Sequence, residues 1–328
     1  MDKQPIISDI RYHSYLCVTN NGSIMIHKKI IGLFFTFTLV ITSTLSLADT
    51  YKHSLGEIEI NGVPKRVVVL GFGSLDFVDA LGVTPIAMPK NLLPEALSKY
   101  KAEQFINTGS LQEVNYETLF TLKPDLIIAE VRMSALYEDL SSVAPTYMFE
   151  IDSNNYWKST QQHWKNISKI LGKEEQGTKL IANIQSKIDT LKKEQSKSSP
   201  KALTVMSNGS NITSFDANGR FSFIYNEAAF KPAISNDVKT TPNRHGNLIS
   251  FEYIADAKPD VLFILDRDQA IGKEIGRAEK SFDNPLVNST PAAKNKRIVY
   301  LDPAAWYLTA GGFNSLNTMI SDLERAIR

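Results

Sequence analysis

Two arginines occupy matching places in a repeated stretch of the chain. Segments 117–132 and 252–267 each run from a glutamate through Lys-Pro-Asp and an apolar run to an arginine, Arg132 in the first copy and Arg267 in the second. Ligands of open α/β sheets bind beyond the carboxyl ends of the strands, where both arginines are expected. Two guanidinium groups facing one cleft could hold an anion. Each could instead pair with a nearby acid such as Asp266, but their matching positions favour the clamp.

Arg220 and His245 are further candidates for the same cleft. Arg220 lies in a turn ahead of a predicted helix. His245 is one of three histidines that follow residue 48, and it alone lies in a loop near the strand that ends at Arg267. His53 is near the start of that region, and His163 is in a helical stretch. A single histidine is more often structural than a ligand, but the position of His245 makes it the candidate.

Trp306 and Tyr307 lie in a predicted loop between the last strand and the last helix. The glycines at 311 and 312 allow this loop to turn sharply before the helix begins. We expect Trp306 to cover the end of the sheet, whereas Tyr307 offers a phenol to the cleft.

The composition is typical of a globular protein. The chain has 328 residues, 43% apolar and 22% charged, which is long enough for two domains that each have a core. The formal net charge of +1 argues against a nucleic-acid-binding surface.

The segment 25–48 has the layout of a secretory signal peptide. His27 and two lysines precede an apolar run at 30–41, and small residues follow up to a cleavage site after Ala48. A membrane anchor is the alternative, but the apolar run is short for a bilayer span. Residues 1–24 would then be an over-extended start or a disordered extension.

The only cysteine, Cys17, lies before the expected cleavage site. A mature chain without cysteine excludes disulfides, thiolate metal sites, a cysteine nucleophile and a lipid-anchoring cysteine. An exported, unlipidated protein fits the periplasm best.

Alternating strand and helix patterns predict an α/β fold with doubly wound, mostly parallel sheets. The glycines at 71 and 73 follow a buried strand at 67–70 and are interpreted as a tight turn, because a lone G-x-G is weak evidence for a nucleotide loop. Residues 116–122 form a helix that Lys-Pro-Asp ends. We therefore expect two Rossmann-like lobes, 49–155 and 200–328, that face a cleft with limited closure.

The stretch 156–199 is predicted to be helical and to join the two lobes. It is lysine-rich and free of proline up to residue 199, and Leu180, Ile184, Ile188 and Leu191 recur at helical spacing. Gly172 divides the stretch into a shorter and a longer helix.

The segments NRHGNLISFE, LDRDQAIG and AWYLTAGG, with the paired Lys-Pro-Asp strands and the linking helix, resemble one family. The chain is similar over about residues 51–328 to the periplasmic substrate-binding proteins of iron-siderophore ABC importers, and among these to the catecholate binders of the VctP and CeuE type. The resemblance implies the cluster A, or type III, fold and a monomer that is not an enzyme and has no cofactor of its own.

The resemblance also implies a ligand and site roles. The ligand would be a ferric catecholate siderophore, either a bis-catecholate or a linear enterobactin-like or vibriobactin-like molecule. His245 and Tyr307 would complete the iron coordination, because ferric ion favours oxygen and imidazole donors. Arg132, Arg220 and Arg267 would offset the negative charge of the complex.

An inner-membrane permease with its ATPase would receive the ligand. The resemblance implies one acidic docking residue on each lobe. Glu227 is the candidate on the second lobe, and either Glu95 or Glu138 on the first.

Three alternatives remain open. The ligand could be haem, a corrinoid or a citrate-type siderophore, although three arginines favour a more anionic ligand than a corrinoid. A periplasmic siderophore hydrolase is less expected, since neither G-x-S-x-G nor H-E-x-x-H occurs. A zinc or manganese carrier is disfavoured because three scattered histidines cannot form a multi-histidine site.

Overall fold

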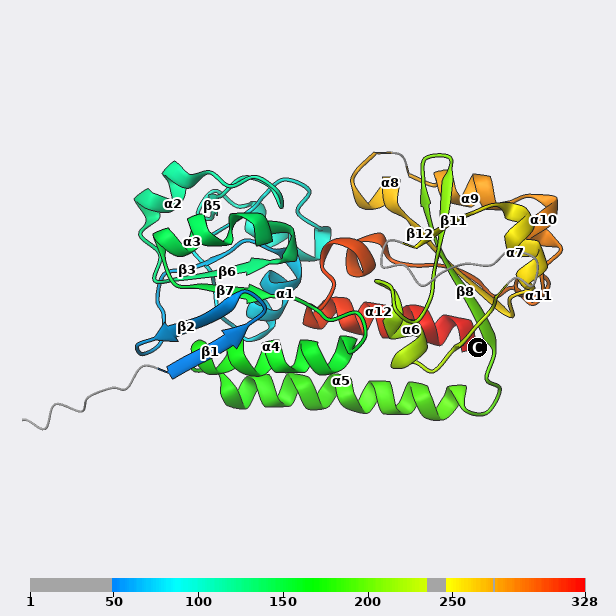
Figure 1. Ribbon diagram of the computed structural model, residues 1–328, viewed down its shortest axis with the longest axis horizontal. Helices are drawn as coiled ribbons and strands as arrows, with labels where there is room; N and C mark the ends of the chain where they lie inside the picture. Colours follow the sequence, from blue (N-terminus) through cyan, green and yellow to red (C-terminus); the bar gives the residue numbers. More distant parts are fainter. Residues whose placement is uncertain (1–48, 235–245, 274, 328) are drawn as a thin grey trace, which may run out of the picture. The chain divides into compact units, whose positions relative to one another are not determined.

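The computed structural model describes residues 49–327, with gaps at 235–245 and at residue 274 (Figure 1). The expected signal peptide, its cleavage site and Cys17 lie outside the described residues. Within the described part, none of the helices has both the length and the apolar character that a membrane span requires.

The first lobe is built on a five-stranded sheet in the order β5-β4-β3-β6-β7, and every pair in it is parallel. A two-stranded antiparallel hairpin, β1–β2, precedes it where the sequence suggests only a polar lead-in. The strands are β1 (Asp49–His53), β2 (Gly56–Ile60), β3 (Val67–Val69), β4 (Ala87–Met88), β5 (Ile106–Asn107), β6 (Leu126–Glu130) and β7 (Thr146–Phe149). The helices are α1 (Phe72–Ala80), η1 (Glu95–Lys101), α2 (Tyr116–Leu122), η2 (Val131–Leu136) and α3 (Tyr137–Val143).

The first sheet is buried on both faces, as its continuous apolar strands predict. Alternate residues of a strand point to opposite sides. In β6, Leu126 and Ile128 pack into the core that contains α1, whereas Ile127 and Ala129 pack into the core that contains Leu119 of α2. The sheet is therefore the middle of three layers.

The second lobe has a six-stranded sheet in the order β11-β9-β8-β12-β13, with β10 beside the start of β8. Its strands are β8 (Lys201–Asn208), β9 (Asn211–Phe215), β10 (Lys231–Pro232), β11 (Asn247–Ile249), β12 (Val261–Asp266) and β13 (Ile298–Tyr300). Its helices are α6 (Ser222–Asn226), α7 (Phe251–Ala257), α8 (Arg267–Ala270), α9 (Arg277–Phe282), α10 (Pro285–Asn288), α11 (Pro291–Lys294), the π-helical turn η3 (Ala304–Leu308) and α12 (Phe313–Ile327).

The second sheet is mostly parallel, as the strand–helix alternation predicts, but β9 pairs antiparallel with both β8 and β11. Asn208 pairs with Asn211, so only two residues connect β8 to β9. Gly209 takes the left-handed conformation (φ 63°) that such a tight hairpin needs. A connection this short permits only antiparallel pairing.

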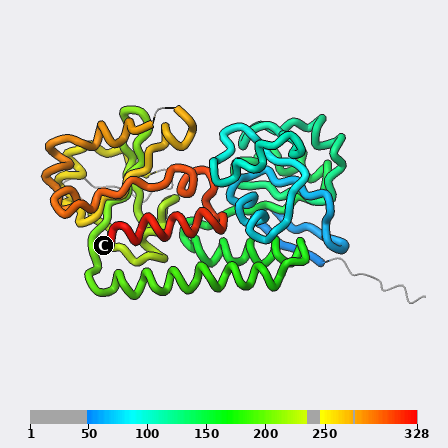
Figure 2. Tube along the Cα trace, turned by 180° about the vertical axis from the view of Figure 1, so that it is seen from behind, coloured from blue at the N-terminus to red at the C-terminus, as the bar shows by residue number. Residues whose placement is uncertain are grey.

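Two helices join the lobes, as predicted. They are α4 (Tyr156–Ile170) and α5 (Glu174–Gln195), and Gly172 separates them in a left-handed conformation (φ 62°). The 22 residues of α5 span roughly 33 Å, and the helix packs on both α4 and α12. Figures 1 and 2 show α5 running alongside both lobes. The α/β fold predicted from the sequence is confirmed, but the lobe limits at 155 and 199 stay a prediction because residues 49–327 belong to one compact unit.

The repeated Lys-Pro-Asp unit has the same structural role in both lobes. Each lysine ends a helix in the left-handed conformation, with φ 46° at Lys123 and 44° at Lys258. Each aspartate then accepts backbone hydrogen bonds from the chain entering the neighbouring strand. The donors are Lys65 (2.7 Å) and Arg66 (2.8 Å) for Asp125, and Lys201 (2.9 Å) for Asp260. The repeat therefore sets the register of β6 on β3 and of β12 on β8.

Candidate functional site

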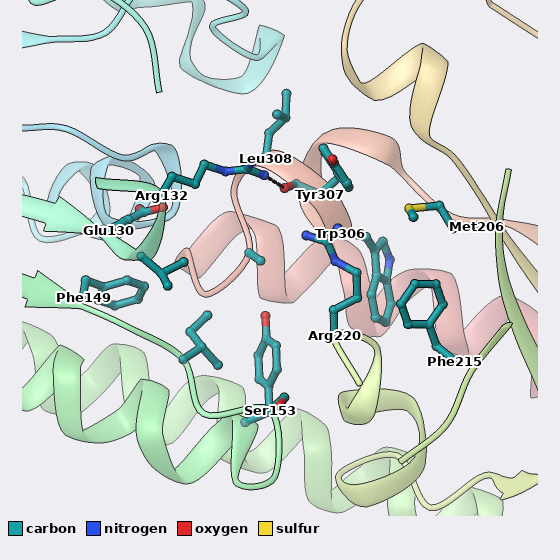
Figure 3. A pocket seen from close by; sticks show the side chains of 14 residues that line it. Glu130, Arg132, Phe149, Ser153, Met206, Phe215, Arg220, Trp306, Tyr307 and Leu308 are labelled. Atoms are coloured by element: carbon teal, nitrogen blue, oxygen red, sulfur yellow. Dashed lines mark hydrogen bonds between the residues drawn. The ribbon is translucent and has the colours of Figure 1, made fainter. Parts of the chain in front are cut away.

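A cavity of about 580 Å³ lies where the carboxyl ends of strands from both sheets meet η3 (Figure 3). It has contributions from β6, β7, α4, β8, β9 and the turn before α6. Its lining residues are Glu130, Val131, Arg132, Phe149, Ile151, Ser153, Tyr156, Met206, Phe215, Arg220, Trp306, Tyr307, Leu308 and Ala310.

Three arginines surround Tyr307. Arg267 Nε donates a hydrogen bond of 2.9 Å to the Tyr307 hydroxyl, and its Nη1 donates one of 3.0 Å to Asn208 Oδ1. Arg132 Nη2 donates to the Tyr307 carbonyl oxygen at 3.3 Å (Figure 3). The guanidinium carbon of Arg220 lies 4.4 Å from the centre of the Tyr307 ring. The fold thus brings the three predicted arginines together around one tyrosine. Two of them come from the repeated unit and the third from the turn before α6.

These three positive charges have no acidic partner at close range in the described part of the chain. Within the described residues, no carboxylate oxygen lies within 4.0 Å of a guanidinium nitrogen of Arg132, Arg220 or Arg267. Burial lowers the pKa of Arg220, and the charge of Arg132 adds to this effect while Tyr307 opposes it. Like charges held this closely repel one another, so the cavity favours an anionic occupant.

The surroundings of Tyr307 lower the pKa of its phenol. Burial raises the pKa of Tyr307. The hydrogen bond from Arg267 and the charges of all three arginines lower this pKa by more than burial raises it, so the net shift is downward. A phenolate is a hard oxygen donor, which suits a hard cation such as ferric ion. Tyr307 can therefore serve both as part of the cationic wall and as a ligand for a metal.

The loop that carries Tyr307 is fixed between the two lobes. The Trp306 indole Nε1 donates to Asp322 Oδ2 (2.9 Å) on α12, and the side chain is buried. Gly311 has φ 83°, and its carbonyl accepts a hydrogen bond of 2.9 Å from Trp164 Nε1 on α4. From the sequence we expect Trp306 only to cover the end of the sheet, but its side chain also lines the cavity.

Glu130 places an acidic side chain in the otherwise basic cavity. It is the last residue of β6, and its Oε1 accepts hydrogen bonds from the Ser74 backbone N–H (2.7 Å) and hydroxyl (2.8 Å). Burial raises its pKa, while the bonds from Ser74 and the charge of Arg132 oppose that shift. Our sequence analysis missed this residue, although its place two positions before Arg132 at a strand end is a signal that could have identified it.

His245, the expected second iron ligand, lies outside the described residues. Its neighbour Gly246 is described and precedes β11, which pairs with β9. Among the described residues, no group of three or more histidine, cysteine, aspartate or glutamate side chains could hold a metal ion by itself. The coordination role of His245 stays a prediction.

The three predicted docking acids differ in exposure. Glu95 has an 89% exposed side chain that forms an ion pair with Lys101 (3.3 Å), and Glu138 is exposed in the first turn of α3. Glu227 is only 9% exposed, and its Oε1 accepts a hydrogen bond from the Trp157 backbone N–H (3.1 Å) at the start of α4. Its burial argues against a docking role for Glu227, whereas both first-lobe candidates keep the exposure that docking requires.

Comparison with known proteins matches this chain to binding proteins, both in a family model and in individual relatives. The family model described as "Periplasmic binding protein" matches residues 67–305. The petrobactin-binding protein YclQ of Bacillus subtilis is 37% identical over 84% of this chain and 87% of its own length. The ferric-anguibactin-binding protein FatB of Vibrio anguillarum is 34% identical over 83% of this chain and 85% of its own.

A solved structure has the same architecture. The crystal structure of the periplasmic catecholate-siderophore binding protein VctP from Vibrio cholerae superposes with a TM-score of 0.80 at 37% identity, over 85% of this chain and 99% of that one. The arrangement of two α/β lobes with a linking helix is thus the type III architecture that the sequence resemblance implies.

Proposed function

The chain belongs to the periplasmic binding protein family, and on that premise we propose that it captures a ferric catecholate siderophore in the cavity at Tyr307. Relatives named for petrobactin, ferric anguibactin and a catecholate siderophore support a ferric siderophore as the ligand class. These relatives are named for binding, so we propose a carrier rather than an enzyme. An inner-membrane ABC permease with its ATPase would receive the ligand from this protein, acting as a monomer in the periplasm.

The observation that carries this proposal is the set of three arginines on one phenol, unpaired with any acid of the described chain. A catechol loses two protons when it binds iron, so a ferric complex of two catechols keeps a net negative charge. Guanidinium groups recognise oxygen anions through directed N–H donors. Aromatic walls from Phe149, Phe215 and Trp306 suit the flat rings of such a ligand.

Each site residue has a proposed role. Arg132, Arg220 and Arg267 bind the catecholate oxygens and offset their charge. Tyr307, as a phenolate, and His245 complete the coordination of an iron that two catechols leave incompletely wrapped. The ferric ion arrives and leaves with the siderophore as cargo, so the protein has no resident metal. Glu95 or Glu138 would contact the permease from the first lobe.

The charge requirement can be tested with Arg220→Gln. We expect the variant to bind the ferric complex of a linear bis-catechol chelator roughly 10- to 100-fold more weakly, because it loses a charge-assisted contact worth about 1.5–3 kcal/mol. Quenching of tryptophan fluorescence reports binding, since Trp306 lines the cavity.

Lys193→Gln is the matched control, because it removes the same charge from an exposed position in the last turn of α5. It should bind the complex like the wild type. A neutral ferric trihydroxamate should bind the wild type and Arg220→Gln with similar, low affinity. Equal affinities of the wild type for the anionic and the neutral complex would overturn the proposal.

A further inference from the structure

Glu130 holds a carboxylate at the cavity wall by a specific arrangement of the chain. Both of its short hydrogen bonds, from the Ser74 N–H and hydroxyl, are accepted by Oε1. They fix the side chain against the first turn of α1. Glu130 is only partly buried and lines the cavity, so its carboxyl group can also accept a hydrogen bond from a ligand.

The glycines at 71 and 73 make room for this carboxylate. A Cβ atom at Gly71 would lie 2.0 Å from Glu130 Cδ, and one at Gly73 would lie 3.3 Å from Oε1 and 2.2 Å from the Ala310 carbonyl oxygen. The G-x-G motif, interpreted from the sequence as a tight turn, thus also accommodates the Glu130 side chain. The hydrogen bonds from Ser74 and the space left by the two glycines therefore hold the Glu130 carboxyl group in a defined place in the cavity wall.

The acidic side chain of the cavity wall consequently lies at the first-lobe end. Glu130 lies on the first-lobe side beside Arg132 and Phe149, whereas Arg220 and Tyr307 lie toward the second lobe (Figure 3). Within the described residues, no lysine or arginine nitrogen lies within 4.0 Å of a Glu130 oxygen. A partly buried carboxylate without an ion-pair partner, beside apolar side chains, favours a cationic or N–H-bearing group.

We propose that Glu130 binds a protonated amine on the siderophore, so that the cavity selects ferric catecholate complexes that carry a cationic arm beside the anionic iron centre. This proposal rests on the proposed function of the same cavity. A uniformly anionic complex that fills the cavity would bring negative charge against Glu130, whereas a complex with an ammonium arm would place opposite charges at both ends. The arm would also favour the ionised form of Glu130, in the same direction as Arg132 and Ser74.

The test uses two matched probes. One is the ferric complex of a linear bis-catechol chelator with a free terminal amine, and the other is the same complex with that amine acetylated. Acetylation removes the positive charge and leaves the catechols unchanged. We expect the wild-type protein to bind the amine-bearing complex roughly tenfold more tightly, as a charge-assisted hydrogen bond predicts. The comparison requires no substitution, so it does not depend on whether a variant folds.

Glu130→Gln identifies the residue responsible, since the amide keeps an acceptor for Ser74 but lacks the charge. We expect it to reduce the ratio of the two affinities to about one. Glu103→Gln, which neutralises an exposed acid elsewhere on the first lobe, should keep the wild-type ratio.

The outcomes separate the two proposals. If the wild type binds both complexes with equal affinity, or if Glu130→Gln keeps the wild-type preference, the selection by Glu130 is wrong while siderophore binding stands. If the wild type binds neither complex, the proposed function itself fails.

Discussion

Tyr307 is the residue on which the electrostatics of the site converge. A guanidinium over an aromatic face is attracted to the ring, which explains how Arg220 can lie 4.4 Å from the centre of the Tyr307 ring although no acid among the described residues pairs with it. Arg267 and Arg132 instead donate hydrogen bonds to its hydroxyl and carbonyl oxygens. The same contacts that hold three positive charges around Tyr307 also favour its phenolate form, which is the form that iron would bind.

A tyrosinate titration of the unliganded protein can test this environment. The arginines lower the pKa of Tyr307 more than burial raises it, so Tyr307 should ionise before the tyrosines whose pKa values are raised. Among these, Tyr51 and Tyr300 have pKa values raised to about 12. The near-ultraviolet tyrosinate signal of the wild type should show an early step below the ordinary value near 10.

Tyr307→Phe should lose this early step and keep the later ones. Because the folded state releases its proton first, the unfolded state binds more protons in this range, and Tyr307 should make folding stability rise with pH up to about 10. A wild-type titration in which Tyr307→Phe removes a late step instead would contradict the proposed environment.

The sequence is informative at this scale only where a pattern repeats. Arg132 and Arg267 were predicted because the same unit precedes each of them, and the structure places both on Tyr307. Glu130 stands at a strand end two positions before Arg132, which the sequence shows, but the placement of its side chain depends on space that Gly71 leaves free, a contact across 59 residues of chain. Glu227 was proposed as a docking acid from the sequence, but the start of α4 packs over its carboxylate, a contact across 70 residues that the sequence does not reveal.

At the level of elements, the connection from η3 to α12 positions the site. Residues 310–312 pass between α1 and α4, where Gly73 approaches the Ala310 carbonyl oxygen and Trp164 binds the Gly311 carbonyl oxygen. This segment fixes η3, and with it Tyr307, against the first lobe. A helix such as α2 (Tyr116–Leu122) was predicted correctly because local periodicity and Lys-Pro-Asp define it, but the packing of this connection depends on contacts distant in sequence.

Gly73→Ala tests the role of this connection. The added Cβ would lie 2.2 Å from a backbone oxygen, so the chain must shift at a cost of about 1–3 kcal/mol. We expect the thermal midpoint to fall by several degrees, on the order of 2–4 °C per kcal/mol, together with weaker binding of the ferric bis-catechol complex.

Gly82→Ala is the comparison for that variant. Gly82 has φ 74° and open space around its Cα, so alanine there strains the backbone without touching the site. It should lower stability and leave affinity unchanged. Unchanged affinity in Gly73→Ala at reduced stability would show that the connection does not position Tyr307.

At the scale of the whole molecule, the two lobes share one framework. Asp76 of α1 accepts hydrogen bonds from the backbone and side chain of both Asn314 and Ser315 at the start of α12, at 2.7–3.2 Å. Burial raises the pKa of Asp76, and these hydrogen bonds oppose that shift. With α5 packed along α12, such contacts agree with the limited closure expected for lobes joined by a rigid helix, which stays a prediction.

Fold class could be predicted from the sequence because buried parallel strands, helix stops and the long linking helix all leave local patterns. The antiparallel hairpin of the second lobe could not, since its only local sign is a short turn at Gly209. The cavity depends on the arrangement of both lobes at once, so its residues could be proposed singly but its charge pattern required the structure.

The visible absorption spectrum of the bound ferric bis-catechol complex is the most direct test of iron binding at Tyr307. On wild-type protein we expect the iron charge-transfer band to change from that of the free complex, because a phenolate joins the coordination shell, and on Tyr307→Phe we expect that change to be lost or much reduced. Identical spectra for the wild type and Tyr307→Phe, both saturated with the complex, would contradict coordination by Tyr307.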